Sequence, residues 1–556
     1  MLKTKGFVLG VILFIIAAGV ASADNSVSSF KSQLLYRGST LYVGGDGPGN
    51  YTHIQDAIDD ATDGDIIIVY PGIYFEDQVT INKALSIQGA EWATTIIDGS
   101  DALLTAEGLI RIIANGDVSF QGFTIRNAGG PSGYGGGDNK LNMGIAASCN
   151  SPDITYTITA NKIIGTQNPN DDYDWGFYAI SGGKENIIFT DNIVTQTGCN
   201  NIVIEKTTGS TDICSNLLDA GCWGIDPIYY MTYDGVDITT LQMVRNNTID
   251  VGTGINPGGS SNNKITGIGF SSAYLGCTGV PDSGKYTNIV ISRNSINNVK
   301  EWRRGIALDN FAWGDGAGGE ILNAVIKNNM INGVSTTPTS FGIRLSGLVT
   351  NTCLQDNEIT NCDMSFWGRI GYYGESTAYP GATQIHFNRF QDNAQGFIWE
   401  GATILNAENN WWGNPSGPRH PDNPGGTGDN VSGTVDFTPW LFYYGPETSL
   451  PVVNITLPVK GYININVLGF IVLKFKSFTT VAIGKIKVVA NATDNQSGIQ
   501  RVEFYVDDQL KGTDTSAPYN WVWTDRGLFF PYTLKAVAYD YYGNQNADVI
   551  KVWKIA

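Results

Sequence analysis

The sequence predicts an all-β protein, made of a long solenoid of stacked coils followed by a β-sandwich. Three observations predict this fold. The 556-residue chain contains 68 Gly and 49 Asn but only 15% charged residues, which is typical of short strands joined by tight turns. A short phrase containing Asn recurs through the middle of the chain. About a hundred residues at the C-terminal end lack this phrase and alternate apolar with polar residues, as antiparallel strands do.

The first 23 residues have the pattern of a secretory signal peptide. Lys3 and Lys5 precede an apolar run from Phe7 to Val20, and Ala21-Ser22-Ala23 supplies the small residues of a cleavage site. The apolar run is shorter than the roughly 20 residues of a membrane span. We therefore expect cleavage after Ala23, no stable membrane span afterwards, and a secreted or cell-surface protein.

The repeated phrase has the form apolar-x-apolar-x-x-Asn-x-apolar. Its key asparagines are separated by 31, 24, 31, 47, 35, 28 and 31 residues. They are Asn161, Asn192, Asn216, Asn247, Asn294, Asn329, Asn357 and Asn388. Such intervals predict stacked coils that bury a common core. We expect each Asn to lie at a corner of a coil, in a left-handed backbone conformation, with its amide stacked on the Asn of the next coil.

A second phrase, Gly followed by an apolar residue, lies between most of the asparagines and predicts one further strand per coil. It occurs as Gly176-Phe177, Gly224-Ile225, Gly267-Ile268, Gly305-Ile306, Gly342-Ile343 and Gly396-Phe397, with Asn201-Ile202 as a degenerate member. Before the first coil, Thr52-His-Ile-Gln55 has the pattern of a capping box and opens a short amphipathic helix. This helix would close the end of the core.

Two segments carry a family resemblance. The stretch from Tyr42-Val-Gly-Gly-Asp to Gly89 resembles the start of right-handed parallel β-helix proteins of the pectate-lyase-like superfamily, and the Asn repeats resemble its carbohydrate-binding and sugar-hydrolase branch. The segment from Asn409-Asn-Trp411-Trp412-Gly413 to Trp440-Leu441 resembles the closing part of secreted members. The resemblance implies a β-helix over residues 38–445 that acts on or binds polysaccharide.

Residues 451–556 form a second predicted domain. Their short alternating strands and turns, such as Lys511-Gly512-Thr513, predict a β-sandwich similar to the bacterial and archaeal Ig-like modules of cell-surface proteins. Asp494, Asp507 and Asp540 could bind calcium there, as could the acidic loop 170–174, but we expect turn-forming roles for all of them. No cofactor is predicted beyond this possible calcium, and no metal site is assigned.

Charge and cysteine content exclude several functions. The formal net charge of −18 disfavours nonspecific binding to nucleic acid or to anionic membranes, which needs a basic field. Seven irregularly spaced cysteines do not form a disulfide framework. Cys214 with Cys222, or Cys353 with Cys362, could pair, but we interpret the cysteines as small buried residues. The three histidines, His53, His386 and His420, do not cluster in the sequence.

Candidate site residues follow from alignment of the Gly-apolar strands. Because side chains alternate along a strand, three columns are expected to face outward. These columns and the neighbouring Trp302 supply the candidate catalytic residues Glu205, Asp226, Arg304 and Arg344, and the candidate substrate-binding residues Trp175, Tyr178, Trp223, Trp302 and Asp309.

The distances in this alignment select one carboxylate pair. Glu205 and Asp226 on adjacent coils would be roughly 8 Å apart, within the window of an inverting glycosidase, whereas Asp309 would be too distant to join them. Arg304 or Arg344 could contact an acidic sugar or act as the base of a β-elimination. Two functions stay open. The first, which the sequence favours, is a polysaccharide-binding envelope protein that could act as an adhesin, and the second is a polysaccharide lyase or glycoside hydrolase.

Overall fold

A computed structural model describes the chain from Gly38 to Ile555 with internal gaps. The described residues are 38–100, 108–128, 143–165, 175–180, 182–197, 200–219, 227–232, 235–252, 266–272, 284–300, 303–309, 319–334, 340–369, 380–401, 403–445, 449–467, 470–494, 498–525, 528–541 and 543–555.

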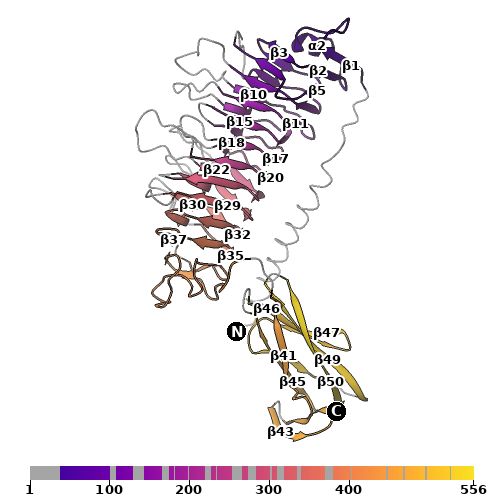
Figure 1. Cartoon of the computed structure of the whole chain (residues 1–556), viewed down its shortest axis with the longest axis vertical. Helices are drawn as coiled ribbons and strands as arrows, with labels where there is room; N and C mark the ends of the chain where they lie inside the picture. Colours follow the sequence, from indigo (N-terminus) through magenta and orange to yellow (C-terminus); the bar gives the residue numbers. More distant parts are fainter. Residues whose placement is uncertain are drawn as a thin grey trace.

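Three long parallel sheets form the larger part of the molecule, and their strands stack coil upon coil (Figure 1). Each strand pairs in parallel with the equivalent strands of the neighbouring coils. This topology is a right-handed parallel β-helix, as the sequence predicts. Sheet A contains β1 (Thr40–Val43), β2 (Ile66–Val69), β5 (Ser86–Gly89), β8 (Val118–Gln121), β11 (Thr155–Thr159), β14 (Asn186–Thr190), β17 (Thr211–Cys214), β20 (Gln242–Arg245), β24 (Ile289–Ser292), β28 (Val325–Lys327), β32 (Cys353–Gln355), β35 (Gln384–His386), β38 (Leu405–Asn406) and β40 (Val435–Asp436).

The other two long sheets complete each coil. Sheet B contains β3 (Gly72–Phe75), β6 (Thr95–Asp98), β9 (Thr124–Arg126), β12 (Lys162–Ile164), β15 (Ile193–Thr195), β18 (Leu217–Asp219), β21 (Thr248–Asp250), β25 (Ser295–Val299), β29 (Met330–Gly333), β33 (Glu358–Thr360) and β36 (Arg389–Gln391). Sheet C contains β4 (Val79–Ile81), β7 (Ile110–Ile112), β10 (Met143–Ala147), β13 (Trp175–Ala179), β16 (Ile202–Glu205), β19 (Ile228–Met231), β22 (Thr266–Ser271), β26 (Arg304–Asp309), β30 (Phe341–Ser346), β34 (Met364–Arg369), β37 (Gly396–Trp399) and β39 (Val431–Ser432). A short fourth parallel sheet contains β23 (Lys285–Thr287), β27 (Glu320–Leu322) and β31 (Val349–Thr350).

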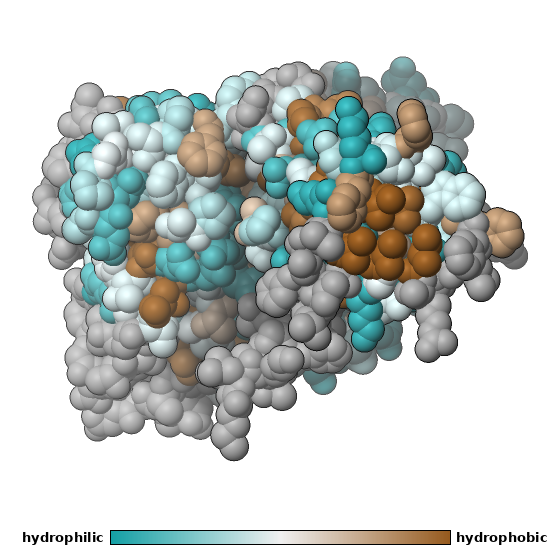
Figure 2. Space-filling view, turned by 90° about the horizontal axis from the view of Figure 1, so that it is seen from below, coloured by the Kyte–Doolittle hydropathy of each residue, from teal (hydrophilic) through white to brown (hydrophobic). Residues whose placement is uncertain are grey.

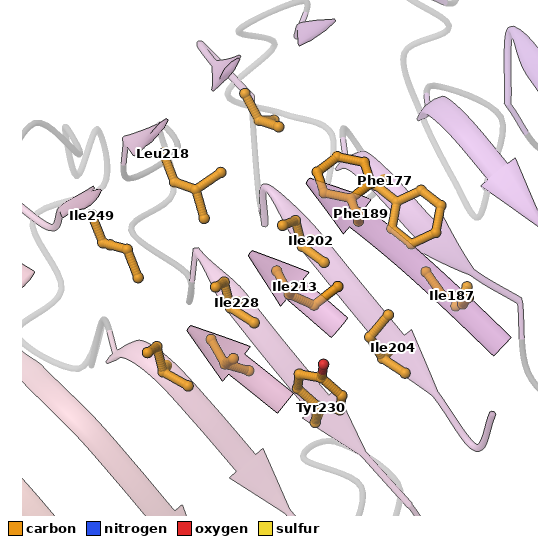
Figure 3. Close-up of a cluster of buried hydrophobic side chains, with 14 of the residues drawn as sticks. Phe177, Ile187, Phe189, Ile202, Ile204, Ile213, Leu218, Ile228, Tyr230 and Ile249 are labelled. Atoms are coloured by element: carbon orange, nitrogen blue, oxygen red, sulfur yellow. The ribbon is translucent and has the colours of Figure 1, made fainter. Parts of the chain in front are cut away.

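The interior of the coils is a continuous apolar core. Figure 3 shows Phe177, Ile202 and Ile228 from successive strands of sheet C, together with side chains from the other two sheets. These three side chains are completely buried. Burial of a side chain of this size contributes roughly 1.5 to 3 kcal/mol. No single coil could enclose such residues alone, so stacking supplies the stability.

The predicted Asn ladder is present and includes the degenerate member Asn216. The backbone N–H and the Nδ2 amide of Asn161 both donate to Oδ1 of Asn192, at 3.0 and 3.2 Å, and the Nδ2 amide of Asn192 donates to the carbonyl of Ile158. Equivalent contacts continue through Asn216 and onward to Asn388 and Asn410. Each amide therefore satisfies backbone groups that a buried corner leaves without a sheet partner.

One detail of the ladder prediction is wrong. The left-handed residue at each corner is the one before the ladder Asn, for example Ala160 (φ 54°) before Asn161 and Asp191 (φ 56°) before Asn192. The preceding residue makes the turn, and the ladder Asn thereby keeps its backbone N–H and side chain aligned with the next coil.

A second series of side-chain amide contacts, with fewer members, lies near the C-terminal end of the β-helix. The backbone N–H of Cys362 donates to Oδ1 of Asn393, and Nδ2 of Asn393 donates to the carboxylate of Asp429 at 2.6 Å. Burial raises the pKa of Asp429 to about 6, although the hydrogen bonds from Asn393 oppose this shift. Asp429 is thus a titratable group inside the end of the coil.

Helix α2 (Ile54–Asp60) covers the N-terminal end of the core with Ile54, Ala57 and Ile58. The predicted capping box is wrong, because the N-cap residue is His53 and its side chain makes no capping hydrogen bond. Glu76 performs this role instead, since its Oε1 accepts the backbone N–H of Ile54 at 2.7 Å. The carbonyl oxygen of the Gln55 side chain accepts the backbone N–H of Thr80. Tertiary contacts therefore replace the local cap.

The C-terminal module has two antiparallel-rich sheets that enclose a separate core, including Val488, Phe504 and Trp523. The smaller sheet contains β41 (Val452–Leu457), β45 (Ile486–Thr493) and β48 (Tyr519–Trp523). The larger sheet contains, in spatial order, β43 (Phe470–Lys476), β42 (Tyr462–Val467), β44 (Thr480–Ile483), β50 (Gln545–Ile555), β49 (Leu528–Asp540), β46 (Ile499–Val506) and β47 (Gln509–Asp514). This arrangement confirms the predicted Ig-like β-sandwich.

Two further expectations concern cysteines and membrane spans. Cys149, Cys214, Cys353 and Cys362 are free thiols, so the alternative pairing of Cys353 with Cys362 is wrong, whereas Cys222 lies outside the described residues. Over the described parts of the chain, no helix combines the length and apolar character needed to cross a membrane. The predicted signal peptide, residues 1–23, lies outside these parts.

Candidate site on the outer face of sheet C

The outer face of sheet C carries the described candidate residues. Tyr178, Val203, Tyr229, Gly269, Ala307, Arg344 and Trp367 occupy equivalent positions on neighbouring strands. A second row contains Glu205, Met231, Ser271, Asp309, Ser346 and Arg369. The residues between these positions, such as Ile204, point into the core.

All six described candidate residues are buried. Trp175, Tyr178, Glu205, Arg304, Asp309 and Arg344 are each no more than 8% exposed. Trp223, Asp226 and Trp302 lie outside the described residues. The sequence alignment places the candidates on the same face of the sheet as the structure does, but it gives no indication of this burial.

One strand of the alignment is wrong. Ile202 pairs with Ile228, not with Ile225, so Tyr229 is the neighbour of Val203 and Met231 is the neighbour of Glu205. The position that the alignment gave to Asp226 is therefore occupied by Tyr229. The signal that identifies this strand is the run Ile228-Tyr-Tyr-Met231, whose Ile228 and Tyr230 are buried, rather than the glycine before it.

The half of this face toward the N-terminal end is apolar, and we call it the apolar half. Its buried cluster consists of Met143, Ala146, Trp175, Tyr178, Val203 and Met231. The rings of Trp175 and Tyr178 meet edge to face with centroids 4.8 Å apart. The hydroxyl of Tyr178 donates to the carboxylate of Glu205 at 2.6 Å. Glu205 is therefore held at the edge of an apolar cluster by a buried hydrogen bond.

The other half is charged, and we call it the charged half, from β26 to the residue after β37. The guanidinium of Arg344 makes a two-point ion pair with the carboxylate of Asp309, in which the Nε donates to Oδ1 at 3.0 Å. Nη1 of Arg304 donates to Oγ1 of Thr266 at 3.2 Å. Arg344 and Asp309 thus neutralise each other, as a buried pair must in order to offset the loss of water.

The charged half also contains three residues that the sequence analysis missed. The ring of Trp367 stacks on Phe341 with centroids 5.1 Å apart, and the guanidinium of Arg369 lies 4.4 Å from the centroid of the Trp367 ring. The indole Nε1 of Trp367 donates to Oε1 of Glu400 at 2.9 Å. Trp367 and Arg369 are half-buried and Glu400 is exposed. We call these three residues the Trp367 cluster.

Trp367 and Arg369 were missed because Ser365 stands where most strands of sheet C have Gly. The register nevertheless aligns Trp367 with Arg344 and Arg369 with Ser346. A search for alternating aromatic and charged residues, as in Phe366-Trp-Gly-Arg369, could have found this strand.

The described carboxylates on this face are widely separated. Glu205 and Asp309 share a row but are three strands apart, which at about 4.8 Å per strand is roughly 14 Å. Asp309 and Glu400 are also three strands apart, since Glu400 directly follows Trp399, the partner of Gly368. Both separations exceed the roughly 5 to 9.5 Å between the two carboxyl groups of glycosidases. The described acids therefore do not form such a pair.

No cluster of three or more possible metal ligands occurs among the described residues. In the C-terminal module, Asp494 accepts the backbone N–H of Gly498, Asp507 accepts that of Thr533 and Asp540 accepts that of Asn544. The contacts of Asp494 and Asp540 are local and agree with the predicted turn-forming roles. Asp507 lies between β46 and β47 with a φ of 49°, and its carboxylate bonds to β49 rather than within the turn. The acidic loop 170–174 lies outside the described residues.

Comparison with known proteins gives one family match. The model of the bacterial Ig domain family matches residues 477–537, within the C-terminal module. No curated protein matches this chain by sequence. Fibronectin(III)-like modules of Clostridium thermocellum CbhA are 23% identical over 22% of this chain and 50% of their own, with a TM-score of 0.15.

Several solved structures are similar to the larger part of the chain. The A-module of the Azotobacter vinelandii mannuronan C-5 epimerase AlgE6 is 15% identical, over 63% of this chain and 91% of its own, with a TM-score of 0.38. The PL6 family alginate lyase AlyGC is 13% identical, over 63% of this chain and half of its own, with the same score. A tailspike protein of E. coli bacteriophage HK620 is 11% identical over 91% of both chains, with a TM-score of 0.37. The assignment of the β-helix itself comes from the sheet topology.

Proposed function

We propose that this chain is an exported polysaccharide-binding protein whose charged half of sheet C contacts the sugar chain. The predicted signal peptide at residues 1–23 supports export. The observation that carries the binding proposal is the Trp367 cluster. One indole ring positions a cation on its face through Arg369 and an anion at its edge through Glu400.

The chemistry of the cluster suits a sugar polymer. A guanidinium held against an aromatic ring presents several N–H donors in a fixed plane, and it matches the hydroxyl and carboxylate oxygens of sugars. The carboxylate of Glu400 accepts hydrogen bonds from hydroxyl groups. Because Phe341 and Trp367 hold Arg369 in place, less side-chain entropy is lost when a ligand binds. A ligand that carries both hydroxyl and carboxylate groups can bind the guanidinium of Arg369 through its carboxylate and the carboxylate of Glu400 through its hydroxyl groups.

Binding without turnover is favoured over catalysis. A glycoside hydrolase needs two carboxyl groups flanking one bond, and those described on this face are roughly 14 Å apart. Arg344, a candidate base for a lyase, is engaged with Asp309. We therefore propose an envelope or adhesive role for the chain.

The experiment is a binding measurement on a panel of neutral and acidic polysaccharides, including alginate and polygalacturonate. We expect Trp367→Ala to weaken binding at least tenfold, and Trp367→Phe to weaken it less, because Phe keeps the stack but loses the hydrogen bond to Glu400. Trp92→Ala is the matched control, since Trp92 is an exposed tryptophan near the N-terminal end of the β-helix. Equal binding by the wild-type and Trp367→Ala chains would exclude this site.

The same samples test for catalysis. The release of new reducing ends or unsaturated sugars, abolished by Glu205→Gln or by Arg344→Lys, would overturn the proposal that the chain binds without turnover. Failure of every polysaccharide to bind would overturn the binding function itself.

A further inference from the structure

One face of the C-terminal module carries an apolar row that crosses five strands of the larger sheet. Phe475, Ile463, Val481, Trp553 and Pro531 are neighbours in the register of β43, β42, β44, β50 and β49. Ile465, Ile483 and Ile555 form a second row beside the first. We call these eight residues the apolar sheet face. Figure 2, which views the molecule from the end that carries β43, shows hydrophobic residues gathered there.

These residues face away from the core of the module. Alternate positions on the same strands, Ala482 and Val552, are completely buried and belong to that core. Phe475 is 53% exposed and Trp553 is 37% exposed, while Ile463 and Val481 are half-buried. Phe478, in the turn between β43 and β44, is fully exposed. An apolar surface that is continuous over several strands marks an interaction site.

Lysines lie on and beside the apolar sheet face. Lys551 is exposed on the same side of β50 as Trp553, and the exposed Lys460 precedes β42. Lys474 and Lys476 flank Phe475 on the edge strand β43, with their side chains toward the other side of the sheet. Lys551 is two residues before Trp553 on β50. Its Nζ donates to Oγ1 of Thr533 on β49 at 2.5 Å. Five lysines and no acidic residue occur between Pro451 and Thr493, although the whole chain has a net charge of −18. The segment that contains β42, β43 and β44 is therefore basic within an acidic protein.

We propose that the apolar sheet face docks on an anionic lipid surface, with Phe475, Phe478 and Trp553 entering the headgroup region. Apolar and aromatic side chains bordered by lysines are the pattern of proteins that lie on membrane interfaces. The apolar residues remove surface from water, while the lysines contact anionic headgroups. This contact would hold an exported chain at a cell envelope without a membrane-spanning segment, and it is independent of the Trp367 cluster.

A second copy of this chain fits the face less well. Isologous pairing of two identical faces would bring the lysines on their borders together, and like charges at a contact oppose association. A bilayer rich in anionic lipid presents the opposite charge over the whole area. Charge complementarity therefore selects the lipid surface.

The test uses the chain from Asp24 onward, which lacks the predicted signal peptide and its apolar run. Cosedimentation is measured with vesicles of phosphatidylcholine alone and of equal parts phosphatidylcholine and phosphatidylglycerol. We expect binding to the anionic vesicles that weakens as salt is added. Lys551→Glu, on the same side of β50 as Trp553, should reduce this binding roughly fivefold or more, from about 1 kcal/mol for each lysine near the surface. Lys184→Glu on the β-helix makes the same charge change and is the control.

The double variant Phe475→Ser with Phe478→Ser tests the apolar contribution. Both side chains are exposed, so the variant should fold, and unchanged thermal unfolding verifies this. We expect at least a fivefold loss of binding to the anionic vesicles, whereas Phe442→Ser, at an exposed Phe outside the module, has no effect. Absence of vesicle binding, or binding that none of these substitutions changes, would overturn the proposal. Concentration-dependent dimers abolished by the double variant would instead identify a second copy as the occupant.

Discussion

The two halves of the outer face of sheet C differ although they occupy equivalent positions on the same sheet. In the apolar half, Tyr178, Val203 and Met231 form a buried cluster. In the charged half, the corresponding rows contain Arg344, Asp309 and Arg369. The coil core beneath both halves is equally apolar. The fold therefore depends on the inward residues, while the outward residues are available for other uses.

Stability and recognition draw on different residues in the two halves of this face. In the apolar half, apolar burial and the hydrogen bond from Tyr178 to Glu205 contribute to stability, whereas the charged half carries ionic groups that cost free energy unless they are paired. A protein retains such groups for specificity or for ligand contact in some systems. Substitutions in the two halves should therefore differ in how much free energy of unfolding they remove. They should also differ in which second substitution restores it.

The largest expected effect is that of Asp309→Ala. It leaves the buried guanidinium of Arg344 without its carboxylate, and we expect a loss of about 3 to 5 kcal/mol in the free energy of unfolding. Urea unfolding measures this loss. Asp508→Ala, which opens the exposed pair with Lys535, is the control and should leave stability nearly unchanged.

The double variant Asp309→Leu with Arg344→Met distinguishes a lost charge partner from lost packing. Apolar replacement of a whole buried pair is often neutral, so most of the stability should return. A double variant as unstable as Asp309→Ala would show that the ion pair itself stabilises the charged half.

Stability should also depend on pH through Asp429, the titratable group inside the C-terminal end of the coil. Burial raises the folded-state pKa of Asp429 from 3.8 to about 6, so its stabilising contribution is complete below pH 4 and is lost as the pH rises through 6. Relative to Asp429→Asn, the wild-type chain should lose about 2.4 kcal/mol between pH 4 and pH 7, as measured by urea unfolding. Asp436→Asn, at an exposed carboxyl, is the control. Parallel pH profiles for the wild-type and Asp429→Asn chains would contradict this assignment.

The third prediction concerns the apolar half. Val203→Ala removes two buried methyl groups from the cluster, and we expect a loss of about 2.5 kcal/mol in urea unfolding. Val452→Ala, at a position that is 55% exposed, should change stability much less. If both substitutions have the same effect, the outer cluster does not contribute to the fold.

The smallest predicted effect is that of Tyr178→Phe. The substitution keeps the ring against Trp175 but removes the hydroxyl that donates to Glu205, at a cost of about 1.5 kcal/mol. Tyr42→Phe, at a tyrosine that is 41% exposed, is the control in the same unfolding measurement. A larger loss than that of Val203→Ala would mean that Glu205, rather than apolar packing, dominates this half.

Much of the fold could be predicted from local patterns. The phrase around Asn161 and Asn192 specifies the corners of the coils. The side-chain oxygen of each Asn accepts the backbone N–H of the Asn in the neighbouring coil, so the contact repeats only where each coil has an Asn at its corner. Glycine before an apolar residue located most strands of sheet C, since Gly176 and Gly305 lie too close to the next coil to carry a side chain. The same rule failed at Gly224 and at Ser365, where one strand begins later and another lacks the glycine.

The sequence by itself determined the coil, the closing helix and the Ig-like module, because each rests on a periodic pattern of apolar and turn-forming residues. Only the tertiary structure decided which outward residues meet. Arg344 and Asp309 are 35 residues apart in the chain, and Trp367 contacts Glu400 across 33. Side-chain contacts between coils depend on the strand register and on the length of every turn between them. A shift of three residues, as at Ile228, changes the neighbour of Glu205 without disturbing the repeat.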